Sequence, residues 1–325
     1  MKTQSSRRSF LKKSAAVTMT VPMVMSLEEY ALTAQEGKPA PVPSSKGSVP
    51  NGKIGKVTIS RLICGGNLIS GYAHSRDLIY VSPLLKHYFT DEKILETWAL
   101  CEEHGINTMV LSPSDARAVA LYEKHRARGG KIQYLAQVGP TKDDLKSSVK
   151  QAKDAGASGA FLLGNYSDAW TREGDAHLII ELLANIKEQG LIAGVAAHEL
   201  RTVKDVEKAG GAPDFYMKTL HENKYWSNRK PDQMKEVIDN YNIDNYWCMD
   251  PKETIAYMSE LQRPWIAYKV LAAGAIHPRS GFQHAFDNGA DFINVGMFDF
   301  QVAENAVIVG AAIKAAQNRE REWVG

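Results

Sequence analysis

Cysteine is scarce in this chain of 325 residues, and its three cysteines lie far apart in the sequence. Cys64, Cys101 and Cys248 form no C-x-x-C pair, which excludes both a thiolate metal cage and a disulfide framework. Three cysteines form at most one disulfide.

Long hydrophobic runs and an excess of one charge are also missing. No stretch reaches the roughly 18 to 20 consecutive apolar residues that a membrane-spanning helix needs. Lysine and arginine number 39 against 37 aspartate and glutamate residues, and no basic stripe is interleaved with aromatic residues. We therefore expect neither a membrane span nor a nucleic-acid partner. With 44% hydrophobic residues, the composition is that of a globular protein.

The first 34 residues predict an export signal. Residues 5–13 read SSRRSFLKK, and a mildly apolar run follows from Ser14 to Leu27. This pattern resembles a twin-arginine signal peptide, which is removed during export. It implies passage through the twin-arginine export machinery to the periplasm or the extracellular space. Without residues 1–34 the chain has 34 basic and 35 acidic residues, so its slight basicity belongs to the leader.

A segment rich in proline, glycine and serine follows the leader. Residues 36–52 read EGKPAPVPSSKGSVPNG and contain too few apolar side chains to pack into a core. We therefore divide the chain into a signal peptide (1–34), a flexible linker (35–52) and one folded domain (53–325).

Eight short β-rich apolar runs alternate with amphipathic stretches of helical period in the folded domain. The runs are Leu62–Gly65, Thr108–Leu111, Tyr134–Val138, Ala160–Leu163, Ile192–Ala196, Phe215–Lys218, Trp265–Val270 and Phe292–Val295. The helical stretches are Glu92–His104, Ala116–Arg128, Lys142–Ala155, Asp175–Gln189, Val203–Ala209, Pro231–Tyr241, Pro251–Gln262, Gly281–Asn288 and Gln301–Arg319.

This alternation predicts an α/β protein with a single (β/α)8 barrel, the TIM barrel. Strands separated by helices form parallel sheets through right-handed crossovers. Eight units fit a closed barrel better than an open sheet, and LICGGNLISG after the first run is not a G-x-G-x-x-G loop. We therefore expect the chemistry at the C-terminal ends of the strands.

Several of these strand ends resemble the aldo/keto reductase family. KVTISRLICGGNLISG and EEHGINTMVLSP are similar to the family's V-S-R-L-G-x-G and A-x-x-x-G-I-N-x-x-D-T-A segments. IIELLANIKEQGLIAGVAAHE resembles its K-x-x-G-x-I-x-x-x-G-V-S segment, and WIAYKVLAAGAI its A-Y-x-P-L-A-x-G strand. The resemblance spans residues 53–305 and implies a TIM barrel, a carbonyl substrate and NADP as cofactor.

The same resemblance implies a catalytic tetrad that this chain does not keep. The family uses Asp, Tyr, Lys and His, and the matched motifs place them at Val110, Asp115, Gln137 and Gly164 or Asn165. A reductase without the tyrosine proton donor and its lysine lacks the electrophilic half of hydride transfer. Either the barrel performs other chemistry, or the tetrad aligns at other positions.

Two lysine-bearing segments resemble a second family, the class I aldolases of the deoxyribose-phosphate aldolase type. DFYMKTLH and AYKVLAAGAI are similar to that family's D-F-x-K-T and V-K-x-x-G-G-I segments, over the last third of the chain. The resemblance makes Lys218 the Schiff-base lysine and Lys269 the lysine that tunes it. Burial or a neighbouring cation would lower the pKa of either lysine and make it a nucleophile or base. The alternative is a lysine that extends to solvent.

Histidine and glutamate follow two neighbouring predicted strands. His198 and Glu199 occur in GVAAHE, and His221 and Glu222 occur in KTLHE. Imidazole and carboxylate groups bind divalent metals, and they also serve as general acids and bases. Both interpretations stay open, with candidate metal ligands His198, Glu199 and His221 and candidate catalytic residues Lys218, Lys269 and His198.

A long loop after the first predicted strand has the length of a ligand-binding loop. Its aromatic and hydrogen-bonding side chains suit a polyhydroxylated ligand, and similar residues follow other strands. The candidate substrate-binding residues are Asn67, Tyr72, His74, Arg76, Asn165, His221, Glu222, Tyr225, Trp226 and Asp299.

Arg279 and the start of the last predicted helix suggest an anion site. Barrels often bind phosphate near strands seven and eight, at a helix N-terminus. Arg279 is therefore the candidate cofactor-binding residue, positioned for the 2′-phosphate of NADP. The alternative role for Asp299 is that of a helix cap.

The sequence as a whole predicts an exported TIM-barrel enzyme related to aldo/keto reductases. We expect it to act on a small carbonyl or carbohydrate-derived substrate by lysine and histidine acid-base chemistry of the lyase or isomerase type. One alternative is an NADP-dependent aldo/keto oxidoreductase, and another is a non-enzymatic exported sugar-binding barrel. The sequence leaves open whether NADP or a divalent metal binds and whether the chain forms a homo-oligomer.

Overall fold

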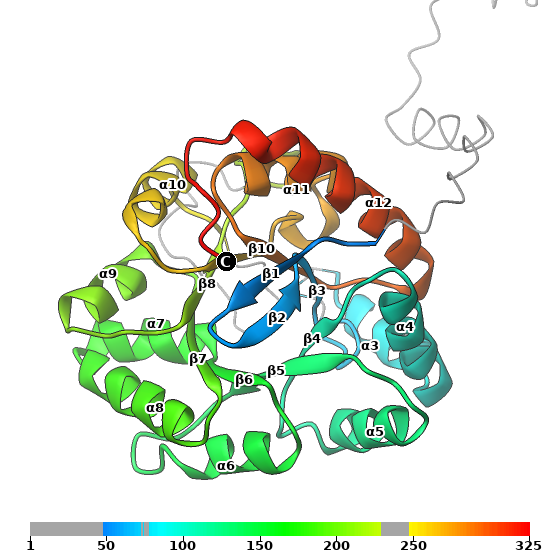
Figure 1. Ribbon diagram of the computed structural model, residues 1–325, viewed down its shortest axis with the longest axis horizontal. Coiled ribbons are helices and arrows are strands. Elements are labelled where there is room, and N and C mark those ends of the chain that lie inside the picture. Colours follow the sequence, from blue (N-terminus) through cyan, green and yellow to red (C-terminus); the bar gives the residue numbers. More distant parts are fainter. Residues whose placement is uncertain (1–47, 73, 75–77, 229–246) are drawn as a thin grey trace, which may run out of the picture. The chain divides into compact units, whose positions relative to one another are not determined.

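Eight parallel strands close into a barrel around which the chain winds once (Figure 1). The computed structural model describes residues 48–72, 74, 78–228 and 247–325. The export signal, Arg76 and the helix predicted at Pro231–Tyr241 lie outside the described residues. Around the barrel the strands are β3 (Leu62–Cys64), β4 (Thr108–Leu111), β5 (Gln133–Val138), β6 (Gly159–Leu162), β7 (Ile192–Ala197), β8 (Phe215–Thr219), β9 (Trp265–Tyr268) and β10 (Phe292–Val295), and β10 pairs with β3.

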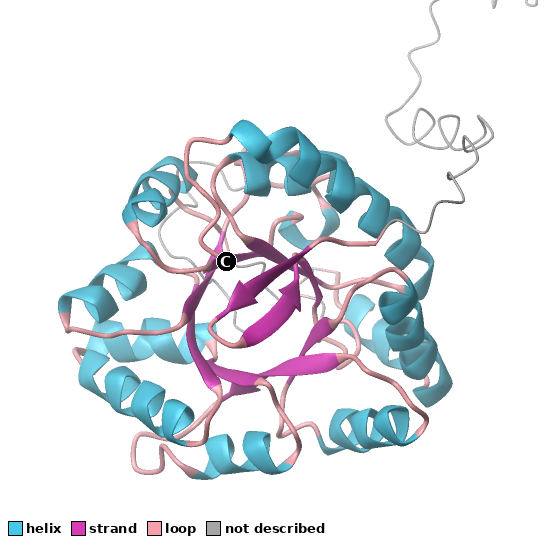
Figure 2. Cartoon of the chain, viewed as in Figure 1, coloured by secondary structure: helices cyan, strands magenta, loops and turns pink. Residues whose placement is uncertain are grey.

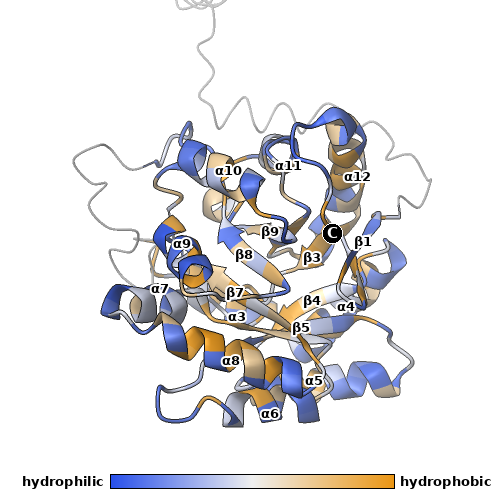
Figure 3. Cartoon of the chain, turned by 60° about the vertical axis from the view of Figure 1, so that its left-hand side comes forward, coloured by the Kyte–Doolittle hydropathy of each residue, from blue (hydrophilic) through white to orange (hydrophobic). Residues whose placement is uncertain are grey.

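Helices cover the outside of the barrel (Figure 2). They are α3 (Val81–Tyr88), α4 (Asp91–Glu103), α5 (Ala116–Ala127), α6 (Ser147–Asp154), α7 (Gly164–Glu173), α8 (Ala176–Glu188), α9 (Leu200–Lys208), α10 (Pro251–Glu260), α11 (Pro278–Asp287) and α12 (Asp299–Ala315), with 3-10 turns η2 (Ala272–Gly274) and η3 (Ala316–Asn318). Figure 3 shows that helices such as α8 carry both hydrophobic and hydrophilic residues, as helices between a sheet and solvent do.

The predicted TIM barrel is confirmed, and each of the eight predicted strands overlaps an observed one. The structure adds two helices that the pattern did not predict, α3 and α7. It also adds an antiparallel hairpin of two strands, β1 (Asn51–Ile54) and β2 (Val57–Ser60), before the barrel. The hairpin begins inside the segment predicted as a linker, and it lies across one end of the barrel (Figure 1). Its Ile54 and Ile59 are fully buried against the barrel interior.

Side chains of each barrel strand alternate between the interior and the helix layer, because successive residues of a strand point to opposite faces. On β8, Phe215 and Met217 belong to the interior cluster, whereas Tyr216 packs with the outer core. The interior cluster also contains Ile63, Val110, Leu135, Phe161, Ile192, Ala196, Ile266 and Phe292. This alternation decides which side chains reach the mouth of the barrel.

Among the helices that the structure describes, none has the length and apolar character to cross a membrane.

Candidate functional site

A cavity of about 700 Å³ opens at the C-terminal ends of the barrel strands. This volume lies in the range of small-molecule binding sites. All eight strands or the loops after them contribute to its lining, which includes Gly65, Asn67, Val110, Gln137, Phe161, Gly164, Asn165, Ala196, His198, Met217, Tyr268, Lys269 and Asn294. The cavity therefore lies where the fold predicts the chemistry.

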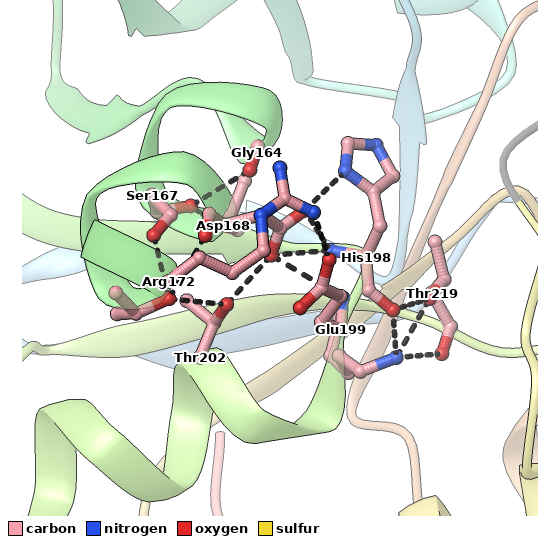
Figure 4. A network of polar contacts seen from close by, with 11 residues as sticks. Gly164, Ser167, Asp168, Arg172, His198, Glu199, Thr202 and Thr219 are labelled. Atoms are coloured by element: carbon pink, nitrogen blue, oxygen red, sulfur yellow. Dashed lines mark hydrogen bonds and ion pairs between the residues drawn. The ribbon is translucent and has the colours of Figure 1, made fainter. Parts of the chain in front are cut away.

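A buried histidine and a buried aspartate form a hydrogen-bonded pair at this cavity (Figure 4). The Nδ1 atom of His198 lies 2.8 Å from Oδ2 of Asp168. His198 is only 6% exposed and Asp168 is fully buried. Because Nδ1 faces a carboxylate, it carries the ring proton, and Nε2 carries the lone pair.

Helix α7 holds Asp168 in place. The helix starts directly after β6, and its first two turns bring Asp168 against the residues that follow β7. The Asp168 carboxylate accepts hydrogen bonds from the backbone N–H of His198 at 3.1 Å and of Glu199 at 3.3 Å, and from the Thr202 hydroxyl at 2.7 Å. These bonds satisfy the buried charge and fix its orientation (Figure 4).

Burial, with a smaller contribution from the charges of Lys269 and Lys218, lowers the pKa of His198 to about 4 against the opposing effect of Asp168. The imidazole is therefore neutral at physiological pH. A neutral, oriented imidazole next to a cavity can accept a proton at Nε2, while the Asp168 carboxylate stabilises the resulting cation.

Tyr268 and Lys269 approach His198 from the end of β9. The rings of His198 and Tyr268 lie 5.4 Å apart, and both residues line the cavity together with Lys269. Gly164 permits this approach, because a Cβ atom at that position would lie 2.6 Å from Cε1 of His198 and 2.8 Å from the Tyr268 hydroxyl. A larger residue at position 164 would push the two rings apart.

The loop after β9 is held in an unusual backbone conformation. Lys269, Ala272 and Ala273 have φ values of 62°, 45° and 56°, in the left-handed region that non-glycine residues rarely adopt. Such strain costs roughly 1 to 3 kcal/mol per residue and concentrates at functional sites. Lys269 and Ala273 both line the cavity, so the strain lies at its wall.

Lys218, predicted as a catalytic residue, lies in the barrel wall rather than in the cavity lining. Its neighbour Met217 points inward, so Lys218 points to the other face of β8. It is 1% exposed, and its Nζ donates to the carbonyl oxygen of His198 at 2.8 Å and to the Thr219 hydroxyl at 2.7 Å. Burial lowers its pKa. Its contacts hold the backbone of His198.

The three candidate metal ligands do not form one site. Within the described ranges, no group of three or more His, Cys, Asp or Glu residues could hold a metal ion. His198 is bound to Asp168, and Glu199 forms an ion pair with Arg172. The Nε2 atom of His221 accepts the Cys248 N–H at 3.0 Å, which makes it a hydrogen-bonded residue of the barrel wall. We derive no step through a metal.

The structure separates the predicted substrate-binding residues into two groups. Asn67, Tyr72, His74 and Asn165 line the cavity. His221, Glu222, Tyr225, Trp226 and Asp299 are not part of its lining, and Arg76 lies outside the described residues.

The two positions predicted near an anion site also lie apart from the cavity. Asp299, the first residue of α12, accepts hydrogen bonds from the Tyr88 hydroxyl and from Lys93 Nζ, the latter at 2.8 Å, so it joins α12 to α3 and α4. Arg279 is exposed on α11 and does not line the cavity.

Sequence reasoning missed Asp168, Tyr268 and Asn294. Asp168 lies on a short helix that the pattern did not predict. Tyr268 and Asn294 lie within predicted strands, where the period-two alternation could have shown them. The positions that matched the reductase tetrad, Val110, Asp115, Gln137, Gly164 and Asn165, all line the cavity, so the alignment located the site although it offered no tetrad.

Comparisons with known proteins establish the fold. No protein-family model matches the sequence, and no curated protein does so. A proposed aldo-keto reductase from Pseudomonas aeruginosa aligns with a TM-score of 0.55 at 18% identity, over 83% of this chain and 99% of its own. Another from the same organism aligns at 0.56 and 17%, over 82% and 98%. At such identities the similarity shows a shared barrel fold alone.

Proposed function

We propose that this chain is an enzyme that moves a proton at the carbon next to the carbonyl group of a small substrate, as in an isomerisation or a β-elimination. The observation that carries this proposal is the Asp168–His198 pair, buried, held by four hydrogen bonds to the Asp168 carboxylate and facing a cavity of substrate size. Neutral histidines oriented by a carboxylate act as general bases.

In the proposed reaction, His198 accepts the proton at Nε2 while its Nδ1–H stays on Asp168. The negative charge that develops on the carbonyl oxygen is stabilised by the Lys269 ammonium, with the Tyr268 hydroxyl as a further donor. In an isomerisation of a 2-hydroxy carbonyl substrate, the imidazolium returns the proton to the former carbonyl carbon. The proton of the 2-hydroxyl group passes to the former carbonyl oxygen, so the carbonyl group moves to the neighbouring carbon. In an elimination the electron pair of the enolate expels a leaving group from the β-carbon.

Hydride transfer from NADPH is the alternative that the shared barrel fold supports. The positions that would supply the reductase tetrad carry Val110, Asp115, Gln137 and Gly164 or Asn165, so tyrosine and lysine are missing there. Arg279, the predicted partner of the 2′-phosphate, is exposed outside the cavity. These residues do not fit the cofactor, and we derive no step through it.

Solvent deuterium exchange tests the proposal without knowledge of the product. Protein is incubated in D2O with glyceraldehyde, dihydroxyacetone or xylose, and proton NMR follows the hydrogen next to the carbonyl. The wild type should exchange it, and His198→Asn should be slower by roughly 100-fold or more. His87→Asn, an exposed histidine on α3, is the matched control. Equal exchange by wild type and His198→Asn would contradict the proposal.

Binding measurements on the same protein samples distinguish the two alternatives, a reductase and a non-enzymatic sugar-binding barrel. Calorimetric titration with NADPH and NADP+ reports on the reductase, because a reductase must bind its cofactor. Sugar binding without any exchange would instead indicate the non-enzymatic sugar-binding barrel.

We also propose that the enzyme works outside the cytoplasm, on the support of the twin-arginine pattern at residues 5–13. Replacement of Arg7 and Arg8 by lysine should retain the protein in the cytoplasm, as fractionation and immunoblotting would show. Unchanged export of that variant would contradict the proposal.

A further inference from the structure

Five neutral amide side chains line the cavity. Gln301, on α12, accepts the backbone N–H of Phe298 and so caps its own helix. The other four each come from a different strand or strand end: Asn67 after β3, Gln137 on β5, Asn165 after β6 and Asn294 on β10. Neither aldehyde nor ketone chemistry requires amides. We therefore assign these amides to contacts with the part of the substrate that does not react.

The strand alternation aims Gln137 and Asn294 into the barrel. Gln137 is two residues beyond Leu135, and Asn294 is two residues beyond Phe292, and both apolar residues belong to the interior cluster. In the closed order of eight strands, β3 lies four strands from β7, which precedes His198. Asn67 therefore follows the strand opposite the proposed base, and β10 is the neighbour of β3.

Two of these amides have a buried oxygen that no described residue satisfies. The Oδ1 atoms of Asn165 and Asn294 have no hydrogen-bond partner among the described residues. The Nδ2 atom of Asn294 donates to the sulfur of Met217, at 3.8 Å. A buried carbonyl oxygen without a donor is costly, so a cavity that keeps two of them suits a ligand that brings donors.

Hydroxyl groups match these amides because each hydroxyl, like each amide, both donates and accepts. Apolar side chains lie between the amides at the cavity lining, among them Val110, Phe161 and Met217. They suit the C–H groups of a carbon chain that carries hydroxyls on its other side.

We infer that the cavity binds a polyhydroxylated aldehyde or ketone, a free sugar or sugar derivative, with its carbonyl end at His198 and its remote hydroxyls at Gln137 and Asn294. This inference rests on the proposed function for the position of the carbonyl end. It assigns Gln137 and Asn294 as the residues that determine substrate specificity.

Calorimetric binding of two pairs of probes tests the inference. Xylose and fructose are compared with 2-pentanone and cyclohexanone, which have a carbonyl group and no hydroxyls. The wild type should bind the sugars and discriminate against the ketones. Asn294→Leu, which keeps the approximate volume of the side chain, should bind the sugars roughly tenfold more weakly or worse. Gln151→Leu, an exposed amide on α6, is the matched control and should bind like the wild type.

Gln137→Met is the second variant, for the case in which circular dichroism shows that Asn294→Leu does not fold. It should weaken sugar binding in the same direction. Sugar affinity unchanged in the folded variants, or equal affinity for ketones and sugars, would overturn the inference.

The His198→Asn protein separates this inference from the proposed function. If it binds the sugars as the wild type does and neither protein exchanges deuterium, the inference stands and the proposed function fails. If the wild type exchanges deuterium into hydroxyl-free ketones as fast as into sugars, the proposed function stands and the inference fails.

Discussion

The Nδ1 atom of His198 lies 2.8 Å from Oδ2 of Asp168, and both side chains are almost completely withdrawn from solvent at the mouth of the barrel. Two residues from different βα units meet here because only Leu163 separates β6 from α7. A carboxylate this deeply buried needs several donors, and the protein supplies them from the backbone of the next strand end. The pair is therefore built into the barrel wall rather than carried on a surface loop.

Stability should depend on pH through His198. Its pKa is about 4 in the folded chain, below the ordinary value of 6.5. The unfolded chain thus binds a proton at higher pH than the folded chain does, and the stability present above pH 6.5 is lost as the pH falls toward 4. Between pH 7 and pH 4.5 the free energy of unfolding should fall by about 2 to 3 kcal/mol more in the wild type than in His198→Asn.

Urea unfolding at the two pH values measures this difference. The His87→Asn control should follow the wild type, since His87 is exposed. Identical pH dependence in wild type and His198→Asn would show that His198 is not held neutral by the fold.

Replacement of Lys269 by methionine should affect both the rate and the imidazole. Loss of the cation that faces the developing enolate should lower kcat by roughly 100-fold. The pKa of His198 should rise, because the Lys269 charge is one of its causes of depression. Steady-state kinetics and an NMR titration of the imidazole test the two effects, and Lys269→Arg should restore part of the rate. A normal kcat in Lys269→Met would remove Lys269 from the mechanism.

Replacement of Gly164 by alanine should displace the His198 and Tyr268 side chains from their present positions. The added Cβ would lie 2.6 Å from the His198 ring and 2.8 Å from the Tyr268 hydroxyl, closer than Cβ atoms come to non-bonded atoms in folded proteins. We expect activity to fall by roughly tenfold or more, because small displacements of catalytic groups are costly. Gly310→Ala on α12, where a Cβ meets no atom within 4 Å, is the control. Full activity of Gly164→Ala would show that the His198–Tyr268 contact is dispensable.

Lys218 should not form an imine with substrate. Its ammonium group is buried and bound to the carbonyl oxygen of His198 and to Thr219, outside the cavity lining. Borohydride reduction in the presence of glyceraldehyde, followed by peptide mass spectrometry, should leave Lys218 unmodified. A reduced adduct at Lys218 would revive the class I aldolase interpretation.

The barrel was predictable because each of its strands is a short buried run bounded by turn residues and helices. The side chains at the mouth of the barrel were less predictable. The end of a strand is predicted only to within a residue or two, and an error of one residue exchanges the side chains that point inward with those that point outward. Lys218 illustrates the problem. It ends a correctly predicted strand, yet its inward neighbour is Met217, so the lysine faces the helix layer.

Asp168 was unpredictable for a different reason. Its helix, GNYSDAWTRE, opens with glycine and asparagine and has no regular apolar stripe, so its sequence reads as a loop. The helix exists because Trp170 and its neighbours pack against the rest of the barrel. Contacts distant in sequence therefore decided the partner of His198, while the position of His198 after a predicted strand was visible from the start.

The most direct test of the central claim is a double-mutant cycle of deuterium exchange with Asp168→Asn, His198→Asn and the double variant. If the two residues act as one proton acceptor, each single variant should lose roughly 100-fold in exchange rate. The double variant should then be little slower than either single one, because residues that act as a unit are not additive. Losses that multiply in the double variant, or an Asp168→Asn protein that exchanges at the wild-type rate, would contradict the claim.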